Sequence, residues 1–143
     1  MSLNKGELLS IKSDELNTSS ILKKKVFVLP IDKSIYKIGA TFEWNWENEN
    51  PSKEKKNILI SQFKEISTSK FEVINHEAGV RPSVKDRRPI IGLHKKHRAI
   101  GVFNGLGSRG CFSAPLLAEE FLNYLECNTD LNNETKIERY YNI

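Results

Sequence analysis

A glycine-rich stretch, Asn-Gly-Leu-Gly-Ser-Arg-Gly-Cys, is the part of the sequence whose residue types and spacing point most directly to chemistry. Its glycines match G-x-G-x-x-G between an expected strand over 99–103 and an expected helix that begins about Ala114. Glycines allow close approach to the backbone, and the N–H groups at a helix N-terminus favour negative charge or electron-rich oxygen. The stretch is therefore a candidate ligand-binding loop. Its residues are Asn104, Gly105, Leu106, Gly107, Ser108, Arg109, Gly110 and Cys111.

This loop does not complete a dinucleotide-binding unit. Such a unit needs a second strand about twenty residues on, ending in an acidic residue that holds the ribose. Here the expected helix occupies those positions, with Ser113 as its N-cap and a buried face formed by Leu117, Phe121 and Leu125. A polar tail over 128–143 follows, and we expect it to be poorly ordered or loosely docked. The alternative to a binding loop is a glycine turn that only lets strand and helix pack.

Arg81, in the corner Gly-Val-Arg-Pro, is the second candidate. A residue before proline is held extended, and a guanidinium suits two-point binding of a carboxylate. Arg81 also lies in the segment 76–112, where eight Lys or Arg against two acids give a formal charge of +6, compared with +4 for the whole chain. Such a segment favours an anionic partner, either a carboxylate, a phosphate or nucleic acid. A solvated basic face and a surface arginine are the alternatives.

The remaining titratable residues are weaker candidates. The three histidines, His76, His94 and His97, are irregularly spaced for a metal site and are interpreted as one strand and two loop residues. Asp86 is interpreted as the partner of a neighbouring arginine in a turn. The two cysteines lie sixteen positions apart without a second pair, which fits neither a disulfide scaffold nor a zinc ribbon. We therefore expect no metal site.

These candidates must be positioned by an α+β fold, a mostly antiparallel sheet with two main helices packed on it. Apolar runs and alternation predict strands near 6–11, 25–30, 36–44, 71–78 and 99–103, of which the second and third form a hairpin. Helical spacing of apolar residues predicts a further helix over 53–66.

Composition excludes several classes of protein. The 143 residues correspond to about one average domain, and contents of 38% hydrophobic and 28% charged residues argue against wholesale disorder. The sequence has no run of eighteen apolar residues and no apolar stretch near Met1 typical of a signal peptide. We therefore expect a cytoplasmic location and no membrane partner.

Three motifs together resemble the C-terminal end of FAD-dependent oxidoreductases of the D-amino-acid oxidase and glycine oxidase superfamily. They are the stretch from Gly79 to Gly92, the glycine-rich loop, and Ala-Pro-Leu-Leu-Ala over 114–118. The motif Gly-Leu-Gly-Ser-Arg-Gly is especially similar to the corresponding sequence in the oxidase half of the bifunctional enzymes that finish 5-methylaminomethyl-2-thiouridine in tRNA. The likeness spans roughly residues 4–126.

The resemblance implies that Arg81 binds the substrate carboxylate and that residues 104–111 approach the pyrimidine edge of FAD. It implies that residues 1–127 are a partial oxidoreductase, with substrate-domain strands, flavin-contacting loop and helix, followed by the tail 128–143. The complete protein would oxidise an amine or amino acid by hydride transfer to the flavin, and no catalytic residue is assigned.

The sequence contains neither the glycine turn that holds the FAD pyrophosphate in this family nor the acid that holds the ribose. We therefore expect a C-terminal fragment that binds FAD weakly or not at all and is inactive without an N-terminal FAD-binding half. Two alternatives stay open. One is an RNA-binding module that uses the basic segment 76–112, and the other is an inert structural fragment that self-associates through an exposed apolar face.

Overall fold

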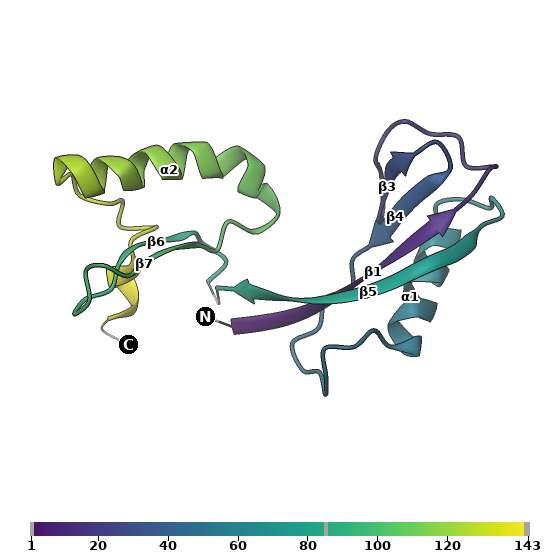
Figure 1. Cartoon of the computed structure of the whole chain (residues 1–143), viewed down its shortest axis with the longest axis horizontal. Helices are drawn as coiled ribbons and strands as arrows, with labels where there is room; N and C mark the ends of the chain where they lie inside the picture. The colour runs from purple at the N-terminus through teal and green to yellow at the C-terminus, as the bar shows by residue number, and fades with distance from the viewer. Residues whose placement is uncertain (1, 85, 142–143) are drawn as a thin grey trace. The chain divides into compact units, whose positions relative to one another are not determined.

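The computed structural model describes residues 2–84 and 86–141. The chain forms two compact units, an N-terminal unit, Leu3–Arg81, and a C-terminal unit that begins at Pro82. The N-terminal unit holds a five-stranded sheet and one helix, and the C-terminal unit holds a two-stranded sheet and a long helix (Figure 1). The predicted α+β fold with two main helices is confirmed.

The sheet of the N-terminal unit has the strand order β2-β3-β4-β1-β5. Its ladders β2–β3, β3–β4 and β1–β4 are antiparallel, and the arrows of β1 and β5 run in opposite directions in Figure 1. The strands are β1 (Ser2–Lys12), β2 (Leu22–Lys23), β3 (Phe27–Asp32), β4 (Ile35–Gly39) and β5 (Glu72–Ser83). The expected hairpin is confirmed, since Val28 pairs with Ile38 across a turn at Lys33.

One predicted strand, 36–44, is shorter than expected and ends at Gly39. Beyond Gly39 the chain still bonds β1, because Thr41 N–H donates to Glu7 O at 3.2 Å and Glu43 forms an isolated bridge with Lys5. The alternation of apolar residues therefore continues past the end of the regular ladder, into a segment whose hydrogen bonds with β1 are irregular. Residues 42 and 44 instead make an edge-to-face ring contact with each other.

Helix α1 (Lys53–Lys64) covers one face of this sheet. Its buried Leu59 and Phe63 pack against side chains of β1, β3 and β4, which are Leu9, Ile11, Val28, Tyr36 and Ile38. The helix begins where the Ser52 hydroxyl accepts a hydrogen bond from the Lys55 N–H at 3.2 Å. The helix predicted over 53–66 therefore forms, two residues shorter at its C-terminal end.

The C-terminal unit pairs β6 (Ile90–Leu93) with β7 (Gly101–Asn104) in antiparallel fashion. The turn η1 (Gly107–Arg109) then continues directly into α2 (Gly110–Cys127), and η2 (Ile137–Tyr140) follows. The strand expected at 99–103 forms as β7, but the expectation that it joins the same sheet as the other four predicted strands is wrong, because it pairs with β6 in a separate two-stranded sheet. The short apolar segment at 90–93 was not assigned as a strand in the sequence analysis, and it forms β6.

Two expectations about α2 are wrong. The helix begins at Gly110 because η1 winds straight into it, so Ser113 is not its N-cap but an inner residue whose hydroxyl donates to Arg109 O at 3.2 Å. The buried face is also shorter than expected. Leu117 is 6% exposed and Phe121 packs against the same cluster, whereas Leu125 is 48% exposed.

The polar tail is packed against the C-terminal unit as far as Tyr141, so the expectation of a poorly ordered or loosely docked segment is wrong for the described residues. Leu131 is buried with Ile91 and Leu117, and Ile91 N–H donates to Thr135 O at 2.9 Å. The Tyr141 hydroxyl donates to the Leu93 carbonyl at 2.9 Å. Isolated apolar residues in a polar sequence show no periodicity, which explains why the pattern did not reveal this packing.

None of the helices within residues 2–84 and 86–141 has the length and apolar character that a membrane span requires.

Candidate functional site

The glycine loop 104–111 has two residues in the left-handed region, Gly105 at φ +75° and Gly107 at φ +60°. A Cβ at Gly105 would lie 2.7 Å from both the Arg88 carbonyl oxygen and Val84 Cγ2, so this glycine permits close packing inside the unit. A Cβ at Gly107 would meet nothing within 4 Å. Gly107 therefore leaves its backbone open to a ligand.

The turn after Gly107 presents backbone donors. The first N–H groups of a helical turn have no acceptor within it, and here they belong to Gly107 and Ser108. The turn leads into the 18-residue helix α2, whose first turn contains no acidic residue, so the positive end of its dipole is not offset locally. Ser108 and Arg109 are exposed beside these donors. The loop can bind electron-rich oxygen or a negative charge.

Arg81 belongs to the N-terminal unit, where its guanidinium contacts two residues of β1. It lies within β5 and not in a corner as expected, because the strand predicted over 71–78 continues to Ser83. Arg81 Nη1 donates to Asn4 Oδ1 at 3.3 Å. The guanidinium also lies over Gly6, because a Cβ built on Gly6 would overlap Cζ, Nη1 and Nη2 of Arg81. Arg81 is an exposed residue. The two predicted elements of the site, Arg81 and the loop 104–111, belong to different units.

Arg81 lies on the face of the sheet that α1 does not cover. On β4, Tyr36 and Ile38 are buried under α1, so Lys37 between them points away from the helix. Lys37 Nζ pairs with Glu77 Oε1 at 2.6 Å, and Glu77 and Arg81 are an even number of residues apart on β5. Arg81 therefore shares the open face with this ion pair.

A buried carboxylate on the α1 side of β1 was missed by the sequence analysis. Glu7 is 1% exposed, and its Oε1 lies 3.2 Å from Lys5 Nζ while its Oε2 lies 2.8 Å from His76 Nε2. The Ser52 N–H donates to Oε2 at 3.0 Å. Burial raises the pKa of the Glu7 carboxyl, but the Ser52 N–H and the Lys5 ammonium lower it by more, so the pKa lies below its ordinary value. The sequence feature that could have revealed this ion pair is the spacing of Lys5 and Glu7, because residues two positions apart lie on the same face of a strand.

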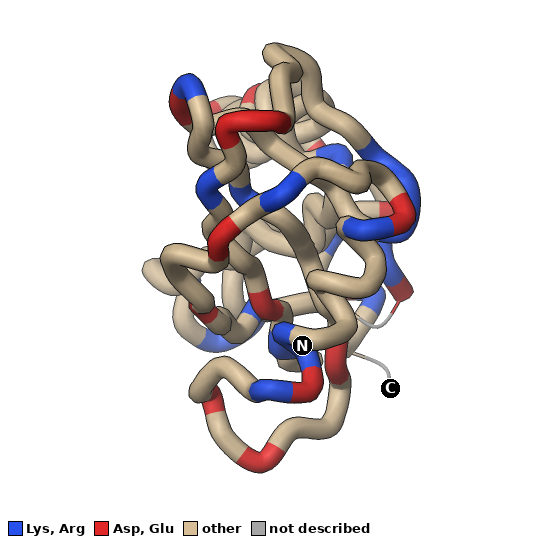
Figure 2. Tube along the Cα trace, turned by 90° about the vertical axis from the view of Figure 1, so that its right-hand side faces the viewer, with Lys and Arg blue, Asp and Glu red and all other residues tan. Residues whose placement is uncertain are grey.

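The interpretation of Asp86 as an ion-pair residue is confirmed, with one partner missed. Arg88 Nε lies 3.6 Å from its carboxylate, and Arg139 Nε from the tail lies closer, at 3.0 Å. Burial raises the pKa of Asp86, whereas the hydrogen bonds from Arg139 and the Arg88 N–H lower it by more, and the net pKa lies below its ordinary value. Arg88 also pairs with Glu134. Acidic residues therefore offset part of the basic segment 76–112. For the chain as a whole, Figure 2 shows Asp and Glu positions interspersed with Lys and Arg positions along the trace.

The histidines have structural partners. His76 is a strand residue, as expected, and the ring of His94 stacks on that of His97 with centroids 5.1 Å apart. His94 Nδ1 accepts hydrogen bonds from the N–H groups of Lys96 and His97, as expected for a loop residue. No group of three or more His, Cys, Asp or Glu that would suit a metal ion occurs in the described part of the chain, and Cys111 and Cys127 are both exposed free thiols.

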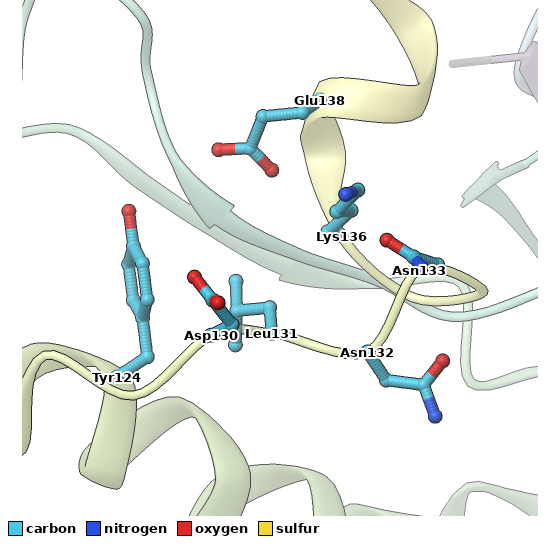
Figure 3. A pocket seen from close by; sticks show the side chains of 7 residues that line it. All are labelled: Tyr124, Asp130, Leu131, Asn132, Asn133, Lys136 and Glu138. Atoms are coloured by element: carbon cyan, nitrogen blue, oxygen red, sulfur yellow. The ribbon is translucent and has the colours of Figure 1, made fainter.

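A hollow of about 690 Å³ lies in the C-terminal unit, between the end of α2 and the tail (Figure 3). Asp130 and Glu138 bring carboxylates to it, together with the Tyr124 phenol and the Lys136 ammonium. Its lining comes from residues 124–138 and not from the loop 104–111, so this hollow is separate from the predicted site. No pattern in the sequence predicts this hollow, because it is built by the packed tail.

Comparison with known proteins identifies relatives along nearly the whole chain. The chain is 26% identical to the glycine oxidase of Bacillus subtilis over 141 residues, which is 94% of this chain and 38% of that protein. It is 26% identical over 121 residues to the tRNA 5-methylaminomethyl-2-thiouridine biosynthesis bifunctional protein MnmC of Idiomarina loihiensis, covering 80% of this chain and 20% of that protein. The chain thus spans between a fifth and two fifths of the length of these relatives.

Solved structures show the same fold. The iminodiacetate oxidase of Chelativorans sp. BNC1 superposes with a TM-score of 0.74 at 21% identity, covering 96% of this chain and 38% of that one. The glycine oxidase of Geobacillus kaustophilus gives a TM-score of 0.69 at 20% identity, covering 91% of this chain and 36% of that one. The family described as FAD dependent oxidoreductase matches residues 3–123. The chain therefore belongs to the FAD-dependent oxidoreductase family.

Proposed function

We propose that this chain is the substrate-binding and flavin-contacting C-terminal part of an FAD-dependent oxidoreductase that oxidises an amino acid or a related secondary amine. The observation that carries the proposal is Arg81, an exposed residue whose guanidinium is held against β1 on the face of the sheet that α1 does not cover. The relatives support the substrate class, because they include a glycine oxidase and an iminodiacetate oxidase, and both substrates are amines that carry carboxylates.

Arg81 binds the substrate carboxylate in this proposal. A guanidinium presents parallel N–H groups that match the two oxygens of a carboxylate, which fixes the orientation of the substrate as well as its affinity. In a polypeptide that joins this chain to an FAD-binding half, Arg81→Ala should weaken substrate binding by about 2–5 kcal/mol, the usual loss when one partner of a desolvated charge pair is removed. An unchanged KM for an amino-acid substrate would contradict this role.

Residues 104–111 hold the pyrimidine edge of the flavin. Their fit to the electron-rich acceptor atoms at that edge of the planar ring rests on Gly107, whose left-handed backbone borders open space, and on the N–H groups of Gly107 and Ser108 at the positive end of α2. When bound, FAD supplies the hydride acceptor of the reaction. The donors and the helix end would stabilise negative charge at that edge, because they are oriented before the charge develops.

The chain alone is proposed to be inactive, with weak or no binding of FAD. Support comes from the share of the relatives that it spans, 38% of the glycine oxidase and 20% of the bifunctional protein. The direct test is gel filtration of the purified chain with excess FAD, followed by flavin absorbance of the protein peak and oxygen consumption with glycine. We expect no flavin in the peak and no oxygen consumption. Retained flavin together with turnover would contradict the proposal.

A further inference from the structure

Two residues of β1, Asn4 and Gly6, surround the guanidinium of Arg81. They are two positions apart and therefore lie on the same face of the strand. A Cβ on Gly6 would lie 2.2 Å from both Nη1 and Nη2 of Arg81 and 2.4 Å from Cζ, which means that the guanidinium occupies the space that a side chain at position 6 would fill. Any side chain at position 6 excludes this arrangement unless Arg81 moves.

Asn4 restrains rotation of the guanidinium in its own plane. Its Oδ1 accepts a hydrogen bond from Arg81 Nη1 at 3.3 Å, and Asn4 itself is fully buried, so surrounding atoms fix where this oxygen lies. A neutral amide takes up one N–H without cancelling the positive charge. An aspartate at the same position would accept the same hydrogen bond but would pair with the guanidinium as an anion.

We propose that Asn4 and Gly6 are positioning residues that hold Arg81 as a preformed fork for a carboxylate. The inference rests on the proposed function of Arg81. An arginine side chain has large rotamer freedom, and the free energy of binding falls when that freedom must be lost on association. A fork that is ordered before the ligand arrives avoids this loss. Gly79 gives a matched control, because it shares the face of β5 with Arg81 and a Cβ there would meet nothing within 4 Å.

The first test measures order in the 143-residue chain by ¹⁵N relaxation of the Arg81 Nε–Hε group. We expect a rigid Arg81 in the wild type and in Gly79→Ala, and an order parameter below about 0.6, the flexible range, in Gly6→Ala. An Arg81 that is already flexible in the wild type overturns the proposal. An Arg81 that stays equally ordered in Gly6→Ala overturns it as well. The wild-type measurement decides by itself if Gly6→Ala does not fold.

The second test separates order from charge by titration with sodium acetate, followed through the Arg81 Nε resonance against sodium chloride at equal ionic strength. We expect wild type and Gly79→Ala to bind acetate equally, and Gly6→Ala to bind about tenfold more weakly because the fork is no longer ordered. Asn4→Asp should keep Arg81 ordered and still bind acetate about tenfold more weakly, since the new carboxylate pairs with the Arg81 guanidinium in place of acetate.

These outcomes distinguish the two proposals. If wild-type Arg81 is ordered but responds to acetate no more than to chloride, Arg81 is not a carboxylate site on this chain, and the proposed function of Arg81 fails while Asn4 and Gly6 keep their structural role. If Asn4→Asp binds acetate as tightly as the wild type, the role of Asn4 as a neutral acceptor is overturned.

Discussion

Glu7→Gln is expected to destabilise the N-terminal unit strongly, although it removes only a charge. Glu7 is buried and contacts the Lys5 ammonium, the His76 ring and the Ser52 N–H, and Lys5 is buried beside it with 5% of its side chain exposed. Glutamine can still accept from Ser52, but Lys5 then lies buried without its counter-charge. Breaking a buried ion pair by removing one partner costs about 3–5 kcal/mol. We expect the lower end, about 3 kcal/mol, because Lys5 also donates to the Asn50 carbonyl.

The assay is urea unfolding followed by tryptophan fluorescence. The only two tryptophans of the sequence, Trp44 and Trp46, both belong to the N-terminal unit, so the signal reports this unit and not the other. The matched control is Glu77→Gln, which removes the same charge from an ion pair that is roughly two fifths exposed. Exposed pairs contribute about 0.2–1 kcal/mol, so this control should shift the midpoint little.

A double-mutant cycle completes the test. Lys5→Met/Glu7→Gln removes both charges, so it should cost less than the sum of the two single variants, because no uncompensated charge is left inside. The reasoning is refuted if Glu7→Gln is no more destabilising than Glu77→Gln, or if the two single costs simply add.

Three further outcomes are expected. The pKa of Glu7 in the folded state lies below its ordinary value. The contribution of Glu7 to the free energy of unfolding is therefore fully present above the unfolded pKa of about 4.3 and is lost as pH falls through the folded pKa. The unfolding curves of wild type and Glu7→Gln should converge in acid as a result. Gly105→Ala should destabilise the C-terminal unit by about 1–3 kcal/mol, because the added Cβ overpacks the site and the backbone is left-handed. Gly107→Ala should cost only about 1 kcal/mol, because its backbone is left-handed but its Cβ would meet open space. Thermal unfolding of the two variants measures this difference. Leu131→Ala should cost about 2–5 kcal/mol and speed hydrogen exchange of the Ile91 amide, and unchanged exchange would show that the tail does not stabilise β6.

The elements with clear periodicity were predictable from the sequence. Alternation at 36–44 and helical spacing of Leu59 and Phe63 reflect one buried face each, and the hairpin and α1 follow from them. The end of β4 was not predictable in the same way, because the chain beyond Gly39 keeps its alternation while its hydrogen bonds become irregular.

Features that depend on contacts distant in sequence were missed. Ser113 looks like an N-cap by residue type, but the preceding turn η1 is itself helical and moves the start of α2 to Gly110. The tail looks disordered by composition, yet Leu131 and Tyr141 attach it to β6. For the candidate site, residue types singled out Arg81 and the loop 104–111, whereas the residues that hold Arg81 became visible only when β1 was found beside β5.

Strand β1 connects the stability of the unit to the geometry of the proposed site. Its residues alternate, so Asn4 and Gly6 meet Arg81 on the open face while Lys5 and Glu7 form the buried ion pair on the α1 side. A slip of β1 by one residue would exchange the two faces, and the burial of Leu9 and Ile11 farther along the strand also opposes it. Because both the ion pair and the buried apolar residues fix the register of β1, Glu7→Gln should lower the urea midpoint without changing the order of the Arg81 side chain. A loss of Arg81 order in Glu7→Gln would show instead that the ion pair alone holds the strand in register.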